Sequence, residues 1–199
     1  MKTALITGAT SGIGKATAEL LAKNNWRLII CGRNVEVLSQ MKADLSVTTE
    51  IFTLNFDIRE FSQVEKAINS IPENWKKIDV LMNNAGNAHG MDSLENGNID
   101  DWDAMMDGNV KGILYISKLL IPGMKAQKSG HIVNISSTAA RQTYANGVVY
   151  CASKKAVDVI SEGMRLELTE FGIKVTNLQP GLTETDFSKV RFKGDEERA

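Results

Sequence analysis

The sequence is poor in the features that mark linkers, metal sites, membrane spans and charged binding surfaces. It has only 3 prolines and no low-complexity tract, so nothing marks an internal linker. Its 2 cysteines, Cys31 and Cys151, lack metal-type spacing, which favours small apolar side chains in a reducing compartment. No apolar run approaches the ~20 residues that a membrane-spanning helix needs. The net charge is −1 without blocks of like charge, which argues against nucleic acid or a membrane surface as partner.

What is present is the composition of an ordinary globular protein, with 43% hydrophobic and 24% charged residues. A length of 199 residues suits one full-sized core, so we expect a single domain over residues 1–199. Met1-Lys2 leads directly into an apolar segment, without the hydrophobic region and cleavage site of a signal peptide. We therefore expect a cytoplasmic location, and no bound metal.

Apolar runs of strand length alternate with segments of helical composition along the whole chain. The expected strands are residues 3–7, 26–31, 50–56, 78–82, 131–135 and 173–178. The expected helices are residues 15–22, 34–45 with Asn34 as cap, 61–71, 99–127 with a bend near Gly108, and 149–171. This alternation predicts an α/β fold, a Rossmann-like doubly wound parallel sheet with helices on both faces. Ligands bind such a sheet beyond the carboxyl ends of its strands, so the following loops are the candidate sites.

The loop after the first strand is rich in glycine and opens a helix. Gly8 permits a tight turn, Gly12 lets the backbone approach a pyrophosphate, and Gly14 permits close helix–strand packing. The free N–H groups of a helix N-terminus favour phosphate binding. The spacing differs from the usual G-x-G-x-x-G, and a glycine-rich turn without a ligand is the alternative. The residues expected to contact a cofactor here are Gly8, Thr10, Ser11, Gly12, Ile13 and Gly14.

The loops after the second and third strands indicate which dinucleotide would bind. An enzyme that prefers NAD places a carboxylate at the end of the second strand, but Arg33 stands there instead. A guanidinium can clamp a 2′-phosphate, which indicates NADP(H), although a solvated surface arginine is the alternative. Asp57 and Ile58 could both face an adenine. Asp57 with Glu60 also fits a reciprocal helix cap, and the two roles can coexist.

Tyr150 and Lys154 lie four residues apart, on one face of the expected helix. A nearby ammonium would lower the pKa of the phenol from its usual value of about 10. Such a pair could act as general acid and base between a carbonyl and an alcohol. The spacing alone also fits a packed tyrosine beside a solvated lysine.

Together these motifs resemble those of the short-chain dehydrogenase/reductase family, along the whole chain. Asn84-Ala85-Gly86 follows the glycine loop, and Asn109 matches the family's helix asparagine. Ser137 matches the catalytic serine, and Pro180-Gly181-Leu182-Thr183-Glu184-Thr185 matches the nicotinamide turn. Gly108, where a bulkier residue is common, and Cys151, directly after the tyrosine, are mild departures.

The resemblance implies a catalytic role for four residues. Tyr150 would exchange the proton of the substrate oxygen, and Ser137 would hydrogen-bond that oxygen. Lys154 would lower the phenol's pKa and bind the nicotinamide ribose, and Asn109 would hold a water that links Lys154 to solvent. Asn83 and Ser136 would then be structural. The further residues implied to bind the cofactor are Asn84, Ala85, Gly86, Tyr150, Lys154, Pro180, Gly181, Thr183 and Thr185.

Three stretches, at residues 75–79, 101–103 and 185–195, resemble the NADP-dependent serine and 3-hydroxy acid dehydrogenases. This implies a small hydroxy acid or the corresponding semialdehyde as substrate. A substrate carboxylate would need a cation, and Arg191 is the candidate beside Ser137 and Tyr150. Pairing of Arg191 with Glu196 or Glu197 is the alternative, and Arg141 is a weaker second candidate. Neither His89 nor His131 falls at a motif position, so both are expected to be structural.

Members of the family continue with a lid helix and a seventh strand, and form homodimers or homotetramers. We therefore expect a substrate-loop segment from about residue 182 onward, a sheet without its C-terminal strand, and homo-oligomeric assembly. Two other functions stay open. A 3-oxoacyl-carrier-protein reductase would need a basic patch, of which Lys125, Lys128 and Arg141 supply a thin version. An NADPH-sensing binding module would not need all four catalytic-type residues.

Overall fold

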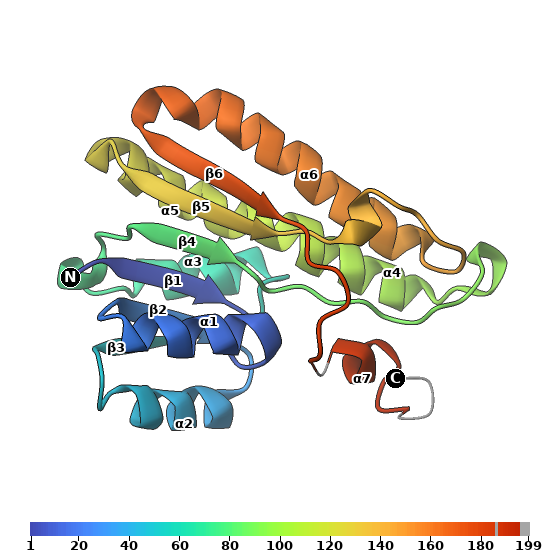
Figure 1. Ribbon diagram of the computed structural model, residues 1–199, viewed down its shortest axis with the longest axis horizontal. Coiled ribbons are helices and arrows are strands. Elements are labelled where there is room, and N and C mark those ends of the chain that lie inside the picture. Colours follow the sequence, from blue (N-terminus) through green and yellow to red (C-terminus); the bar gives the residue numbers. More distant parts are fainter. Residues whose placement is uncertain (186, 196–199) are drawn as a thin grey trace.

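The computed structural model describes residues 1–185 and 187–195 (Figure 1). Within these residues, six parallel strands form one sheet in the order β3-β2-β1-β4-β5-β6. The strands are β1 (Thr3–Thr7), β2 (Arg27–Gly32), β3 (Ile51–Asn55), β4 (Val80–Asn83), β5 (Gly130–Ile135) and β6 (Ile173–Leu178). This is the predicted Rossmann-like doubly wound sheet, with its order reversing between β1 and β4.

Helices cover both faces of the sheet, as predicted. The main ones are α1 (Gly12–Lys23), α2 (Val35–Leu45), α3 (Phe61–Asn69), α4 (Ile99–Met106), α5 (Gly112–Gln127) and α6 (Val148–Leu168). Helices α1 and α2 pack on one face of the sheet, and α3, α5 and α6 pack on the other; in Figure 1, α1 lies in front of the sheet and α3 behind it. A short helix that the sequence did not predict, α7 (Phe187–Arg191), follows the last strand.

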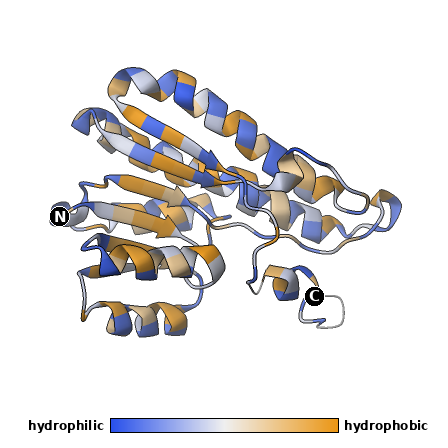
Figure 2. Cartoon of the chain, viewed as in Figure 1, coloured by the Kyte–Doolittle hydropathy of each residue, from blue (hydrophilic) through white to orange (hydrophobic). Residues whose placement is uncertain are grey.

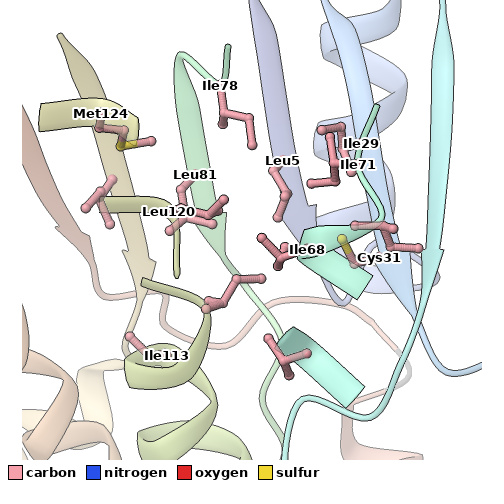
Figure 3. Close-up of a cluster of buried hydrophobic side chains, with 14 of the residues drawn as sticks. Leu5, Ile29, Cys31, Ile68, Ile71, Ile78, Leu81, Ile113, Leu120 and Met124 are labelled. Carbon is pink, nitrogen blue, oxygen red and sulfur yellow. The ribbon is translucent and has the colours of Figure 1, made fainter. Parts of the chain in front are cut away.

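The strands are buried on both faces, which explains their nearly continuous apolar sequences. The register aligns Ile29, Leu5 and Leu81 on neighbouring strands. These side chains pack against α3 and α5 in one core (Figure 3). Their neighbours in the chain, such as Ile6 and Ile30, belong to a second core under α1 and α2. The helices instead alternate hydrophobic and hydrophilic residues, with one side toward the sheet (Figure 2).

One sequence prediction about a helix end is confirmed, and another is wrong. Asn34 caps α2, accepting a 2.9 Å hydrogen bond from the amide of Val37. At Gly108, where a bend was expected, the helical region is interrupted by a π-helical turn over Asp107–Lys111, between α4 and α5. The predicted reciprocal cap of Asp57 and Glu60 does not form: α3 begins at Phe61, and Glu60 makes no side-chain cap bond. The Asp57 carboxylate binds Arg59 instead.

Both cysteines are buried and free, as expected of small apolar side chains. Among the described residues, no helix is both long and apolar enough to cross a membrane. The same part of the chain shows no group of three or more His, Cys, Asp or Glu side chains placed to hold a metal ion.

Candidate active site

A cavity of about 680 Å³ opens beyond the carboxyl ends of the strands, where the topology predicts a ligand. Its walls come from the loops after all six strands, together with α7. Of the predicted cofactor, catalytic and substrate residues, Gly14 and Asn109 do not line it. Those that do are Gly8, Thr10, Ser11, Gly12, Ile13, Arg33, Asp57, Ile58, Asn84, Ala85, Gly86, Ser137, Tyr150, Lys154, Pro180, Gly181, Thr183, Thr185 and Arg191.

The glycine loop has the geometry that its sequence predicted. Gly8 has a φ of +62°, which favours glycine. A Cβ on Gly14 would collide with the carbonyl oxygen of Gly8 and with the amide of Asn84, so this glycine permits close packing. Ser11 caps α1 without a side-chain hydrogen bond. The backbone N–H groups of the first turn are therefore left for a phosphate at the cavity wall, and this loop fits a dinucleotide.

Asn84 holds the loop after β4 against the glycine loop. Its side-chain amide donates hydrogen bonds of 3.0 Å to the carbonyl oxygens of both Thr7 and Gly8. In return, the hydroxyl of Thr7 accepts hydrogen bonds from the backbone amides of Asn84 and Ala85. The loops at the reversal point of the strand order are thus fixed to each other by four hydrogen bonds.

At the end of β2, Arg33 extends into solvent with 65% of its side chain exposed. Its guanidinium lies 3.8 Å from the carboxylate of Asp57. The stronger partner of Asp57 is Arg59, whose Nη2 lies 2.6 Å from Oδ2. Partial burial raises the pKa of Asp57, but the hydrogen bonds from Arg59 outweigh this and hold the pKa below its ordinary value.

Tyr150 and Lys154 lie on α6, and both are buried at the cavity wall. Burial raises the pKa of Tyr150, and a hydrogen bond with Ser137 and the charge of Arg191 only partly oppose the rise. The net effect on this pKa is therefore opposite to the lowering that was expected from Lys154. The Lys154 Nζ lies 5.9 Å from the Tyr150 ring centroid and donates a 3.0 Å hydrogen bond to the carbonyl oxygen of Ile135. Burial lowers the pKa of Lys154 to about 8.

Asn109 is fully buried in the π-helical turn, behind the cavity wall. Its side-chain amide donates to the carbonyl oxygen of Asn87 and to the hydroxyl of Ser153, and its Oδ1 accepts from the amide of Asn87. A Cβ on Gly86 would lie 2.8 Å from that same Oδ1. The side chain therefore fixes the loop after β4 to α6. Its role in holding a water stays a prediction.

Arg191, the predicted carboxylate ligand, lies on the cavity wall near Tyr150. Its Nε donates to the carbonyl oxygen of Gly90, and its Nη1 donates to the hydroxyl of Tyr144, both at 3.0 Å. Its Cζ lies 5.7 Å from the Tyr150 ring centroid. Nη2 is buried and has no hydrogen-bond partner among the described residues. The alternative partners, Glu196 and Glu197, lie outside the described residues.

Several other residues considered from the sequence lie outside the cavity wall. Arg141, the second candidate for a carboxylate, is exposed and does not line the cavity, so the structure does not support it. His131 contacts the hydroxyl of Thr176 at 2.8 Å, on the face of β5 and β6, and lies outside the cavity wall. His89 is also absent from that wall, and burial lowers its pKa. Asn83 donates to Asn134 across the sheet, as a structural residue would.

Sequence reasoning missed residues that organise the site. Arg59, which lines the cavity, stands two residues after Asp57, and that short spacing was the only available signal. Tyr144 lines the cavity and orients Arg191, 47 residues further along the chain. Asp158, on α6, accepts hydrogen bonds from side chains at the ends of both β5 and β6. Its donors are Ser136, Asn177 and Gln179.

A dinucleotide-type loop, a buried tyrosine–lysine pair and a facing serine on a doubly wound sheet define a class of nucleotide-dependent oxidoreductase. Residues 2–196 match the short chain dehydrogenase family, and the chain belongs to it. It is a short-chain dehydrogenase that uses NAD(P) and acts on CH–OH groups.

Two curated relatives are similar to this chain over nearly its whole length. The chain is 40% identical over 196 residues to the NADP-dependent 3-hydroxy acid dehydrogenase YdfG of Salmonella typhi, covering 98% of this chain and 78% of the relative. It is 40% identical over 195 residues to the serine 3-dehydrogenase of Agrobacterium fabrum, covering 98% and 77%.

Among solved structures, the closed form of a serine dehydrogenase complexed with NADP+ matches with a TM-score of 0.94 and 39% identity, covering 99% of this chain and 79% of the other. The serine dehydrogenase from Escherichia coli matches with a TM-score of 0.86 and 37% identity, covering 90% and 82%.

Proposed function

We propose that the protein transfers a hydride between NADP(H) and a small 3-hydroxy acid, L-serine or the corresponding semialdehyde. The observation that carries this proposal is the meeting of Ser137, Tyr150 and Arg191 on one cavity wall. The first two offer hydroxyl groups to a substrate oxygen. Arg191 offers a cation to a substrate carboxylate. Relatives named for 3-hydroxy acids and serine support the same substrate class.

The choice of NADP(H) over NAD(H) rests on the end of β2. Arg33 extends from that position into solvent beside the cavity, and Gly32, Arg33 and Asn34 include no carboxylate that would repel a 2′-phosphate. The cofactor supplies hydride transfer to or from the substrate carbon. The residues predicted to hold it are those of the glycine loop, the loops after β2, β3 and β4, Tyr150, Lys154, and the turn from Pro180 to Thr185.

The side chains of the site would handle the proton and the developing charge. Tyr150 donates its phenolic proton to the carbonyl oxygen during reduction and removes it during oxidation. Ser137 donates a hydrogen bond to the same oxygen and stabilises its negative charge. Lys154 binds the ribose hydroxyls beside Tyr150. Asn109 would hold a water that links Lys154 to solvent, so that protons can be resupplied.

Arg191 would bind the substrate carboxylate through its buried Nη2, the nitrogen left over after Gly90 and Tyr144 are bound. A guanidinium held by two such partners loses little side-chain entropy when it binds an anion. We further propose that residues 1–199 act as one domain, with the substrate segment beginning near residue 182. Homo-oligomeric assembly and a cytoplasmic location also stay predictions.

The test compares Arg191→Met with the wild type on 3-hydroxypropionate and on the neutral 1,3-propanediol, each with NADP+. We expect KM for the hydroxy acid to rise about tenfold to a hundredfold, because a hydrogen bond to a charged group contributes about 1.5–3 kcal/mol. Kinetics on the neutral diol should change little. Arg141→Met is the matched control, since it removes an exposed arginine outside the cavity.

Other results would contradict the role of Arg191 or favour a different function. Equal effects on both substrates, or unchanged KM and kcat for the hydroxy acid, would remove Arg191 from carboxylate binding. Faster NADPH-linked reduction of an acetoacetyl thioester than of malonic semialdehyde would favour a 3-oxoacyl-carrier-protein reductase. NADPH binding without turnover of any of these substrates, L-serine and L-allo-threonine included, would favour the binding module.

A further inference from the structure

Arg59 wraps around the carboxylate of Asp57 at the mouth of the cavity. Its Nε donates to Oδ1 and to Oδ2 at 3.0 Å each, and its Nη2 donates to Oδ2 at 2.6 Å. The backbone amide of Arg59 donates to Oδ1 as well. Both side chains are partly shielded, with 36% of Arg59 and 18% of Asp57 exposed. Arg59 therefore supplies three side-chain contacts and one backbone contact to a single carboxylate.

Arg33 is the other cation near this carboxylate, and its contact is much weaker. Its Nη1 lies 3.8 Å from Oδ2 of Asp57, beyond hydrogen-bond distance, and its side chain is 65% exposed. The lowered pKa of Asp57 reflects the same ranking, because the effects of Arg59 exceed that of Arg33. Arg33 is thus held near the cavity mouth without being committed to Asp57.

Two other acidic groups, Asp107 and Glu60, act on Arg59 only through weaker electrostatic attraction. Asp107 is paired with Lys111 at 2.7 Å, and Glu60 makes no cap bond with its side chain. Arg59 is therefore the main partner of Asp57, and this ion pair leaves the charge of Arg33 available. Without Arg59, Arg33 and Asp57 would cancel, and Arg33 would be drawn onto the carboxylate.

We infer that Arg59 is a positioning residue that sets cofactor specificity: by neutralising Asp57, it keeps Arg33 free to bind the 2′-phosphate of NADP(H). The inference rests on the proposed NADP(H) dependence. Arg59 itself lies outside the motifs of the glycine loop and of the second strand. Without this ion pair, the carboxylate would also repel the 2′-phosphate directly.

The experiment measures Kd for NADP+ and for NAD+ by titration calorimetry on the wild type and on Arg59→Gln. We expect Kd for NADP+ to rise about tenfold, the size of one lost charge-assisted contact. Kd for NAD+, which has no 2′-phosphate, should stay within about twofold. Lys23→Gln, which removes one exposed charge in the last turn of α1, controls for net charge and should change neither value.

Two more variants separate this role from a purely structural one. In the Asp57→Asn/Arg59→Gln double variant, no carboxylate remains to capture Arg33. The ratio of the two Kd values should therefore return toward that of the wild type. Arg59→Lys keeps the charge without the paired geometry and should keep most of the preference, which also covers the case in which Arg59→Gln does not fold.

An equal loss of affinity for both cofactors, or an unchanged ratio in Arg59→Gln, would overturn the inference and leave the proposed function intact. A failure of the double variant to regain the ratio would overturn it as well. Wild-type protein that does not prefer NADP+ to NAD+ would instead overturn the proposed cofactor itself.

Discussion

Two opposing effects act on the pKa of the Tyr150 phenol. Burial raises its pKa, while Ser137 and the charge of Arg191 act in the opposite direction and do not cancel the rise. Tyr150 is therefore protonated at neutral pH. This is the state that a proton donor to a carbonyl oxygen requires.

Tyr150→Phe tests that role with the smallest change to the cavity. We expect kcat for carbonyl reduction to fall by about 10²- to 10⁴-fold, the usual contribution of a positioned general acid. Kd for NADPH should stay near the wild-type value, because the ring and its contacts with Phe187 and Arg191 are kept. Stopped-flow turnover and fluorescence titration would measure the two quantities. Substantial residual turnover would mean that another group supplies the proton.

The charge of the buried Lys154 destabilises the folded protein by an amount that depends on pH. Burial lowers its pKa from 10.5 to about 8 in the folded protein. Between these two values the unfolded chain binds more protons than the native one, so the free energy of unfolding rises with pH. Below the folded pKa the full penalty is present, about 3 kcal/mol for a shift of this size.

Lys154→Met keeps the length of the side chain and removes the charge, so this part of the rise should vanish. The measurement is urea unfolding of both proteins at about pH 7 and about pH 10, comparing the difference in unfolding free energy. Other titrating groups are common to both proteins and cancel in that comparison. A difference that does not change with pH would show that Lys154 keeps an ordinary pKa in the fold.

At the scale of elements, α6 ties the site together through residues spaced at four-residue intervals. Tyr150, Lys154 and Asp158 lie on one face of the helix, toward the ends of β5 and β6. Asp158 accepts hydrogen bonds of 2.9 Å from Ser136 and 2.7 Å from Asn177. Since Ser136 precedes Ser137 and Gln179 precedes the nicotinamide turn, one carboxylate positions two loops of the site relative to the helix.

Asp158→Leu removes that link and takes the acceptor away from the side-chain amides of Asn177 and Gln179, whereas the Ser136 hydroxyl keeps the carbonyl oxygen of Lys154 as acceptor. We expect a loss of about 1–3 kcal/mol in unfolding free energy, the cost of leaving buried polar groups unpaired. We also expect a clear fall in kcat, because Ser137 and the turn at Pro180 lose their common support. Thermal unfolding and steady-state kinetics would measure both.

Asp44→Leu is the matched control for this change. It removes an exposed carboxylate of α2 that accepts one side-chain hydrogen bond, from Gln40, and it should alter neither quantity by much. Equal effects of the two variants would contradict the linking role of Asp158.

The elements themselves could be predicted because their signals are local. Apolar runs that end at glycine identify β1, and Asn34 identifies the start of α2. The cap at Asp57 was predicted wrongly, since Arg59 competes for the same carboxylate and the helix starts later. The links through Asp158 and between Tyr144 and Arg191 could not be predicted, because they join residues that only tertiary packing brings together.

At the scale of the whole molecule, the helices that cover one face of the sheet leave apolar side chains on their outer surface. Leu166 and Val159 on α6 are 81% and 62% exposed, and Leu114 on α5 is 44% exposed. Val159 and Leu166 lie seven residues apart, on the same side of α6. The outer surfaces of α5 and α6 are therefore the surface at which we place the predicted pairing with a second copy.

Leu166→Arg tests the predicted homo-oligomer at this surface. In a symmetric interface each substitution occurs on both copies, so two buried cations would face an apolar surface, and we expect dissociation toward monomers. Sedimentation velocity at micromolar concentration would measure it. Val47→Arg is the matched control, because Val47 is 86% exposed but follows α2, a helix that packs on the other core of the sheet, and its variant should assemble normally. Wild-type protein that sediments as a monomer, or equal dissociation of both variants, would contradict assembly through α5 and α6.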